Sequence, residues 1–390
     1  MTGKLKIVYC TPSIYMAGGV ERVLTSKVNY LASQGDKYDI TILLTDGAGK
    51  PPFYALSDKV KVIHLGIEFE ELWGLSFIRK IPVYLRKQRL YKRRLTEELM
   101  RLRPDITVST LRREINFLCD IPDGSRKVGE LHVSRRNYRN FEPGDTNWLK
   151  DLFSKWWMWR LVKKLRRLDK FVVLTNEDMA TWNELNNVCV IPNPLPAIPT
   201  TRSPLKEKRV IAVGRYAYQK GFDLLLQAWS RAECELPDWH LCIFGAGDRT
   251  PYQQLATDLK LDDTRCELCE ATRNISEEYL RSSLFVFSSR FEGFGMALVE
   301  AMSYGLPVIS FDCPCGPKDI VNNGIDGILV ESGNVEELAK AIVRLAKDRE
   351  LMQHLADEAV MTARKYDINT IGSQWEKLFN SEIMAQLFAF

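Results

Sequence analysis

Residues 288–307 of this 390-residue chain read S-S-R-F-E-G-F-G-M-A-L-V-E-A-M-S-Y-G-L-P. The apolar, aromatic run 282–287 before them is typical of a buried strand, whereas the composition of 293–304 favours a helix. The chain is therefore predicted to pass from a strand through a glycine-rich turn into a helix. Glu292 lies in this turn, and Glu300 follows eight positions later, a little over two helical turns deeper at about 3.6 residues per turn.

Two interpretations of these acids are open on chemistry alone. The carboxylates could hydrogen-bond hydroxyl groups at separate points of one elongated ligand that lies across the helix N-terminus. Gly293 and Gly295 would let the backbone approach that ligand closely, and the predicted binding segment includes Phe294 and Met296. Alternatively, a glutamate early in a helix interacts favourably with the helix dipole, and a later one is solvated. Glu300 fits this second interpretation poorly, because its sequence neighbours are apolar.

The longer stretch R-F-E-G-F-G-M-A-L-V-E-A-M-S-Y-G-L-P-V-I resembles the E-x7-E signature of the retaining glycosyltransferases of family 4. The resemblance extends over nearly the whole chain; it is strongest in 207–331, moderate at the N-terminus and weakest in 66–170. It implies the α/β fold called GT-B, in which two doubly wound, Rossmann-like domains face each other across a cleft. It also implies that Glu300 holds the nucleotide ribose of a donor and that Glu292 holds hydroxyl groups of the donor sugar.

Length and composition agree with a two-domain globular protein. The chain is 45% hydrophobic and 27% charged, with a formal net charge of +4, and it contains no run of about eighteen apolar residues. Since its first residues lead directly into a strand, we expect a cytoplasmic protein without a signal peptide. The nine cysteines are scattered and are expected to be reduced, and the spacings around Cys266 and Cys315 do not favour a zinc site.

The N-terminal half alternates short apolar strands with helical stretches, which predicts a parallel, doubly wound sheet. The expected strands are 5–10, 39–44, 60–65, 106–110, 127–131 and 171–175. A segment with five prolines, 191–204, cannot continue a helix or an inner strand and indicates a linker. The predicted domains are 1–192, completed by a C-terminal helix 367–390, and 207–366, with the linker 193–206 between them. The resemblance implies that the first domain lies on the acceptor side and that the second binds the nucleotide-sugar.

A glycine pair, Gly18 and Gly19, follows the first strand and opens a helix that begins near Val20. Bare N–H groups and the helix dipole at such a position favour an anion, although a glycine pair is more often a flexible loop. The G-x-G-x-x-G dinucleotide fingerprint is absent from the sequence. The resemblance implies that Gly18 and Gly19 face the donor diphosphate from the N-terminal domain.

His132 lies at the carboxyl end of the strand 127–131, where open parallel sheets place their ligands. A histidine in this position is otherwise an ordinary half-buried residue. The resemblance implies that His132 lies near the transferred sugar and the acceptor. Glu130 is expected to point to the opposite face of the strand, which makes it a weaker candidate.

Arg215 and Lys220 stand in the loop G-R-Y-A-Y-Q-K-G after the strand 210–213. One guanidinium group and one ammonium group together can neutralise a diphosphate leaving group, although basic residues in loops are usually only solvated. The pattern G-R-x-x-x-x-K-G resembles the phosphate clamp of the family. A second glycine-rich turn, with Gly245 and Gly247, follows the strand 239–244 and suits close approach by a nucleotide.

Two stretches, 79–103 and 155–170, combine many lysines and arginines with apolar and aromatic residues. Such basic amphipathic helices suit an anionic membrane surface, on which each basic residue contributes about 1 kcal/mol. The alternative is a pair of solvated helices whose apolar sides pack on the domain core. Since no nucleic-acid-binding module accompanies the charge, nucleic acid is not expected as a partner. Two interpretations of these stretches stay open: contact with a lipid diphosphate or, peripherally, with the inner face of the cell membrane, and solvated helices without such contact.

The sequence as a whole predicts a retaining glycosyltransferase that moves a sugar from a nucleotide diphosphate-sugar, with UDP as the first choice, to an acceptor hydroxyl. The expected acceptor is a lipid-linked sugar, with a lipid diphosphate as one form of the link, or a growing polysaccharide or glycan. Glu292, His132, Arg215 and Lys220 are the predicted catalytic residues. No cofactor and no metal are expected, because the chain lacks a D-x-D pair and its basic residues can hold the diphosphate. Two alternatives stay open: a nucleotide-sugar epimerase of the same fold, and a non-catalytic nucleotide-sugar-binding partner protein.

Overall fold

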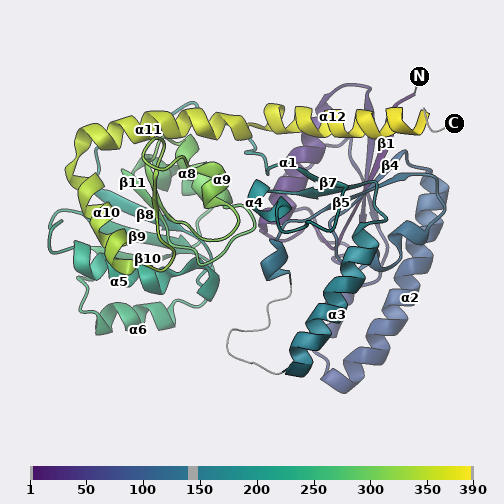
Figure 1. Ribbon diagram of the computed structural model, residues 1–390, viewed down its shortest axis with the longest axis horizontal. Coiled ribbons are helices and arrows are strands. Elements are labelled where there is room, and N and C mark those ends of the chain that lie inside the picture. The colour runs from purple at the N-terminus through teal and green to yellow at the C-terminus, as the bar shows by residue number, and fades with distance from the viewer. Residues whose placement is uncertain (1–2, 139–147, 388–390) are drawn as a thin grey trace. The chain divides into compact units, whose positions relative to one another are not determined.

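The computed structural model describes residues 3–138 and 148–387, which form two compact units. The first unit comprises the chain up to Pro194 and from Ile368 onwards, and the second comprises Leu195–Asp367. Both units are α/β structures with parallel sheets (Figure 1). This confirms the parallel, doubly wound sheets that the alternating strand pattern predicts.

Within the described residues, the sheet of the first unit has seven parallel strands in the order β3-β2-β1-β4-β5-β6-β7. The strands are β1 (Leu5–Thr11), β2 (Tyr38–Leu44), β3 (Lys61–His64), β4 (Ile106–Ser109), β5 (Arg126–Glu130), β6 (Lys170–Val173) and β7 (Val188–Val190). Central β1 is flanked on both sides, with Ile7 opposite Ile40 of β2 and Ile106 of β4. Because both faces of these central strands are covered, their residues are almost continuously buried.

The helices of the first unit cover both faces of its sheet. They are α1 (Gly19–Ser33), α2 (Phe77–Leu102), α3 (Trp148–Leu165), α4 (Asn176–Met179) and α12 (Ile368–Leu387), with short 3-10 turns at Phe69–Leu72, Glu114–Asn116, Leu118–Asp120 and Arg135–Asn137. On one face, the C-terminal α12 lies beside α1 (Figure 1). Ile371, Trp375 and Phe379 of α12 are buried in the core of this unit.

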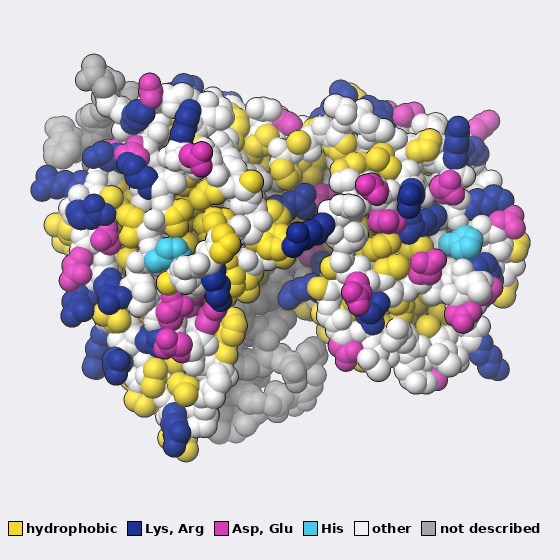
Figure 2. Space-filling model, turned by 180° about the vertical axis from the view of Figure 1, so that it is seen from behind, with side chains coloured by type: hydrophobic (Ala, Val, Ile, Leu, Met, Phe, Trp, Pro, Cys, Tyr) yellow, Lys and Arg dark blue, Asp and Glu magenta, His cyan; other side chains and the backbone are white. Residues whose placement is uncertain are grey.

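The two basic stretches form α2 and most of α3, which project beyond the sheet of the first unit (Figure 1). Tyr91, Leu95 and Leu99 in the second half of α2 are buried, whereas apolar residues in its first half are exposed. Figure 2 shows hydrophobic and basic side chains together at the protruding end of this unit, at the lower left. Among the described residues, no helix is long and apolar enough to cross a membrane.

In the second unit, the described residues form a six-stranded parallel sheet in the order β10-β9-β8-β11-β12-β13. The strands are β8 (Arg209–Val213), β9 (His240–Gly245), β10 (Cys266–Glu270), β11 (Leu284–Phe287), β12 (Val308–Phe311) and β13 (Ile328–Val330). The helices are α5 (Phe222–Ala232), α6 (Thr250–Asp258), α7 (Ile275–Leu280), α8 (Met296–Ser303), α9 (Pro317–Ile320), α10 (Val335–Lys347) and α11 (Arg349–Ala363), with 3-10 turns at Tyr218–Lys220 and Arg364–Tyr366.

Candidate active site

The strand, turn and helix around Glu292 form as predicted, but the helix starts later. It begins at Met296, so 293–295 belong to the turn. Gly295 has a φ of 103°, a left-handed conformation that glycine adopts without a steric penalty, and it caps α8. Glu300 therefore lies only a little more than one helical turn into α8, and the predicted separation of two turns is wrong. The cause is the left-handed turn, which postpones the helix.

Glu292 is buried, with 7% of the residue exposed. Its Oε1 accepts hydrogen bonds from the Nζ of Lys220 at 2.6 Å and from the Oγ of Ser289 at 2.7 Å. Its backbone N–H donates to the carbonyl oxygen of Pro314 at 3.2 Å. The structure thus brings together two residues that are 72 positions apart and holds the carboxylate in one orientation.

Lys220 reaches Glu292 because the loops after β8 and β11 pack closely. Gly221, the next residue, has a φ of 60°, and a Cβ atom there would lie 2.1 Å from the carbonyl oxygen of Ser288. The Oγ of Ser288 in turn donates to the carbonyl oxygen of Lys220 at 2.9 Å. A Cβ atom at Gly214 would lie 3.0 Å from the side chain of Lys220. The two glycines of the G-R-x-x-x-x-K-G pattern therefore allow the lysine to take its position.

Arg215 differs from Lys220 in its surroundings. Its side chain is exposed, and no ion pair joins it to another of the described residues. In this loop, the charge of Lys220 is thus balanced by Glu292, whereas no carboxylate of the described residues balances the charge of Arg215. An incoming diphosphate would gain a full charge-assisted contact from Arg215, whereas it would compete with Glu292 for Lys220.

Two neighbours of this pair carry no obvious sequence signal. Arg290 forms a bidentate ion pair with Asp223, with N–O distances of 2.7 and 2.5 Å, and its guanidinium packs on the ring of Tyr218. The Nε2 of Gln219 donates to the carbonyl oxygen of Phe291 at 3.1 Å. Both contacts tie the loop of Lys220 to the loop of Glu292. The E-x7-E spacing does not reveal them, since the partners are far apart in sequence.

The other predicted binding residues of α8 and its turn lie beside this pair. Gly293 is half-buried in the turn, and Met296 is half-buried at the start of α8. Glu300 is half-buried on α8, as expected for a residue that is not fully solvated. The side chain of Phe294 is buried against Tyr366, with ring centroids 5.4 Å apart, so it packs within the unit.

Packing between loops explains the glycines Gly245 and Gly247 at the end of β9. A Cβ atom at Gly245 would lie 1.7 Å from the carbonyl oxygen of Gly214, and one at Gly247 would lie 3.0 Å from that of Tyr216. The loops after β8 and β9 therefore need glycine for their own packing. The assignment of Gly245 and Gly247 to nucleotide binding stays a prediction.

In the first unit, His132 follows β5, and its side chain is only 6% exposed. Its Nε2 lies 3.5 Å from the Oε1 of Glu130. The expectation that Glu130 points to the opposite face is wrong, because residues two apart along an extended chain lie on the same side. Glu130 also forms a fully buried ion pair with Lys27 of α1, whose ammonium lies 3.9 Å from the ring centroid of Trp375.

Burial lowers the pKa of His132 to about 4, and the nearby Lys27 and Arg112 act in the same direction, against Glu130. The imidazole is therefore neutral at pH 7 and can either donate or accept a hydrogen bond. Glu130 stays ionised, since Lys27 and His132 outweigh the effect of burial and lower its pKa. The histidine is thus held beside a buried carboxylate.

The glycine pair Gly18 and Gly19 lies at the start of α1, as expected. A Cβ atom at Gly18 would lie 1.9 Å from the Oε2 of Glu21, whereas one at Gly19 would meet nothing within 4 Å. A side chain at Gly18 would therefore displace the folded-back carboxylate of Glu21. The role of both glycines toward donor phosphates stays a prediction.

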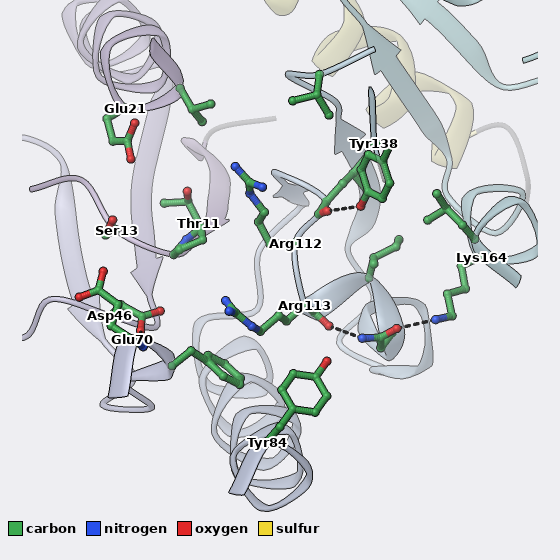
Figure 3. Close-up of a pocket in the computed structure, with 18 of the residues that line it drawn as sticks. Thr11, Ser13, Glu21, Asp46, Glu70, Tyr84, Arg112, Arg113, Tyr138 and Lys164 are labelled. Atoms are coloured by element: carbon green, nitrogen blue, oxygen red, sulfur yellow. Dashed lines mark hydrogen bonds between the residues drawn. The ribbon is translucent and has the colours of Figure 1, made fainter. Parts of the chain in front are cut away.

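A pocket of about 830 Å³ lies in the first unit, at the carboxyl ends of four neighbouring strands (Figure 3). Thr11 ends β1 and Ser13 follows it, whereas Asp46 follows β2, Arg112 follows β4 and Val133 follows β5. Apart from Tyr84 and the α3 residues, which lie in the basic stretches 79–103 and 155–170, the sequence analysis missed this pocket. The sequence pattern that could have predicted the pocket is the set of polar residues at the ends of the apolar strands.

The structure thus defines a protein of two Rossmann-like units with polar and charged groups at the carboxyl ends of the strands of each sheet. That is where open α/β sheets place their ligands. Among the described residues, no group of three or more His, Cys, Asp or Glu side chains is arranged to hold a metal ion.

Comparison with known proteins supports a glycosyltransferase. Residues 197–360 match the family described as glycosyl transferases group 1. An uncharacterized glycosyltransferase of Haemophilus influenzae is 28% identical over 385 residues, which are 95% of this chain and 99% of that protein. The amylovoran biosynthesis glycosyltransferase AmsD of Erwinia amylovora is 31% identical over 225 residues, 54% of this chain and 62% of that protein.

Solved structures show the same fold. The sucrose-phosphate synthase of Thermosynechococcus elongatus matches with a TM-score of 0.79 and 17% identity over 99% of this chain and 100% of that one. The Anabaena protein HepE in complex with UDP and glucose matches with a TM-score of 0.71 and 18% identity over 97% and 100%. The fold is therefore GT-B, as predicted.

Proposed function

We propose that this protein is a retaining glycosyltransferase that transfers a sugar from a nucleotide diphosphate-sugar, with UDP as the preferred nucleotide, to an acceptor hydroxyl. The observation that carries the proposal is the contact of Lys220 with Glu292 beside the unpaired Arg215, at the strand ends of the second unit. The glycosyltransferase relatives support the reaction class. The likeness to a UDP complex makes UDP the first nucleotide to test.

In the proposed reaction, Arg215 and Lys220 stabilise the negative charge that grows on the departing diphosphate. Because this charge is largest in the transition state, the interaction increases the rate of the chemical step. Glu292 binds hydroxyl groups of the donor sugar, and Lys220 and Ser289 keep its carboxylate oriented. Glu300 binds the nucleotide ribose, and the neutral His132 contacts the sugar near its reacting carbon. The diphosphate is held by these cations without a metal ion.

The proposed acceptor belongs to polysaccharide or glycan assembly. The relative from Erwinia amylovora, named for amylovoran biosynthesis, supports this direction. A lipid-linked acceptor would be held in a membrane, where a protein bound to the membrane surface can reach it.

We propose that α2 and α3 bind an anionic membrane surface. Large apolar side chains on or just before these helices are exposed: Trp73, Ile78, Ile81, Leu85, Leu152, Trp156 and Trp159. Ile78 is 82% exposed, and basic residues accompany the apolar ones along both helices. Apolar side chains can enter the headgroup region while the basic ones contact anionic lipids.

Vesicle binding tests the membrane proposal. The protein should co-sediment with vesicles that contain anionic lipid at low salt, and less at high salt. The double substitution Ile78→Gln and Ile81→Gln should weaken this binding. Ile325→Gln is the matched control, since Ile325 is exposed in the second unit. Equal binding of neutral and anionic vesicles, or no effect of the double substitution, would contradict the proposal.

A donor screen tests the enzymatic proposal. The protein is incubated with UDP-, GDP-, ADP- and dTDP-sugars, with and without a pooled lipid-diphosphate acceptor, and released nucleotide diphosphate is measured. Release from one donor that rises with acceptor supports a transferase. Turnover of the donor sugar to its epimer without acceptor would indicate the epimerase. Tight binding of one donor without any release would indicate a non-catalytic partner. Loss of activity with EDTA would contradict the metal-free mechanism.

A further inference from the structure

The pocket of the first unit separates acidic from basic side chains. Glu21, Asp46 and Glu70 lie on one side, Tyr138 and Lys164 lie on the other, and Arg112 and Arg113 lie between them (Figure 3). Arg160 of α3 also lines the pocket. Its volume of about 830 Å³ falls in the range of small-molecule sites.

The acidic side is firmly held in place. Asp46 is only 2% exposed, and its two oxygens accept hydrogen bonds from the Oγ1 of Thr45 at 2.5 Å and from the backbone N–H of Glu70 at 2.8 Å. The hydroxyl of Tyr15 donates to Glu70 at 2.5 Å. Carboxylates fixed in this way accept hydrogen bonds from the hydroxyl groups of a sugar or a polyol.

The cations of the pocket have no carboxylate partners. Among the residues that the structure describes, none of Arg112, Arg113, Arg160 and Lys164 forms an ion pair. Arg113 packs on the ring of Phe69, with 4.2 Å from its guanidinium carbon to the ring centroid. Lys164 donates to the side-chain oxygen of Asn116. This aromatic and amide support orients the cations without neutralising them.

The surroundings of Lys164 disfavour its charged form in the empty pocket. Burial lowers its pKa, and Arg160 acts in the same direction, whereas Asp120 acts against both. Repulsion between the neighbouring cations Arg160 and Lys164 is a cost to the empty pocket. A bound anion would remove that cost, and a phosphate group has the oxygen geometry that guanidinium groups bind well.

We propose that this pocket binds the acceptor, and that the acceptor carries a phosphate group next to the sugar or polyol that receives the new residue. The phosphate lies among Arg112, Arg113, Arg160 and Lys164, and the hydroxyl groups lie against Asp46 and Glu70. This inference rests on the proposed transferase function and deepens it by naming the substrate class. A prenyl diphosphate-sugar and a polyol-phosphate polymer share this chemistry.

Binding assays test the inference independently of catalysis. The probes are a fluorescent short-chain prenyl diphosphate-sugar, a fluorescent glycerol-phosphate hexamer and a neutral disaccharide with the same label, each with saturating UDP present. At least one phosphate-bearing probe should bind clearly more tightly than the disaccharide. Which of the two binds better identifies the source of the phosphate. Equal binding of all three probes would overturn the inference.

The variant Arg113→Gln with Lys164→Gln should weaken the phosphate-bearing probe about ten- to a hundredfold, because it removes charge-assisted contacts. The affinity for UDP is measured on the same variant and should stay at the wild-type value. Lys37→Gln, which removes an exposed charge of the same unit, is the matched control. Should the double variant fail to fold, Arg160→Gln on the exposed side of α3 serves instead. An unchanged affinity for the probe, or an equal loss of affinity for UDP, would overturn the inference.

The two proposals fail in different ways. If the wild-type protein releases no nucleotide from any donor but binds a phosphate-bearing probe through Arg113 and Lys164, the transferase function fails and the pocket assignment stands. If donor turnover is normal and the probe ignores the pocket variants, the transferase function stands and the pocket assignment fails.

Discussion

Lys220 and Glu292 in the loops of the second unit form an ion pair, whereas the described charged side chains in the pocket of the first unit do not pair with each other. In the second unit, Lys220 and Glu292 contact each other at 2.6 Å in a nearly buried position. In the first unit, Arg113 and Asp46 line one pocket without forming an ion pair. A buried pair keeps a site assembled before ligand arrives, whereas unpaired charges leave full electrostatic attraction for a ligand. We therefore propose that the Lys220–Glu292 pair positions its loops and that the cations of the pocket recognise a ligand.

The largest expected effect comes from Lys220→Ala. The substitution removes charge stabilisation of the leaving group and leaves Glu292 buried without its cation. We expect kcat to fall about 10²- to 10³-fold and the free energy of unfolding to fall as well, since a buried charge loses its partner. Steady-state kinetics and thermal unfolding measure both. Near wild-type turnover would show that the loop is not the leaving-group site.

The second-largest expected effect is the pH dependence of stability that His132 contributes in the first unit, which the variant His132→Gln tests. The folded-state pKa of about 4 lies below the ordinary value of 6.5, so the unfolded chain binds a proton at this residue at a higher pH than the folded chain does. The contribution of His132 to the free energy of unfolding is fully present above pH 6.5. It falls as the pH drops toward 4, by at most about 3 kcal/mol.

Chemical denaturation at pH 7 and pH 4.5 measures this difference. The variant should lose less stability than the wild type on acidification. His64→Gln, in which an exposed histidine is replaced, should behave like the wild type. An identical pH dependence of His132→Gln and wild type would mean that His132 is not held neutral by burial.

Arg215→Ala separates recognition from positioning within the second unit. Because Arg215 is exposed and unpaired, its loss should leave the melting temperature unchanged. Activity should fall about ten- to a hundredfold, the value of a charge-assisted contact. Comparison with Lys220→Ala sharpens the contrast, since only the lysine variant should lose both stability and activity. A clear loss of stability in Arg215→Ala would contradict the contrast.

Gly221→Ala is expected to affect stability and not the chemical step, with a loss of about 1–3 kcal/mol. The substitution combines a left-handed φ with a close approach to the carbonyl oxygen of Ser288. Gly333→Ala is the matched control, because Gly333 has a φ of 82° but open space around it. Urea unfolding should show a larger loss for Gly221→Ala than for Gly333→Ala. Equal losses would mean that the two loops do not pack as closely as described.

Local patterns were enough to predict most strands and the position of Glu292 in a turn. The short strand Ile328–Val330 was missed, because three residues carry too little periodicity. The start of α8 was placed three residues early, since the composition of 293–295 does not reveal the left-handed Gly295. Sequence spacing likewise placed Glu130 on the wrong side of His132, although the two-residue period of a strand could have corrected it.

By itself, the sequence determined the class of fold, the two-unit plan and the identity of Arg215, Lys220, Glu292 and Glu300 as candidates, because apolar periodicity and motif spacing are local properties. Only the tertiary structure decided which charges meet. Lys220 neutralises Glu292 across 72 positions of sequence, and Asp46, Arg113 and Lys164 share a pocket because their strands and helices assemble side by side. Such pairings depend on distances through space, which follow from the packing of the whole unit.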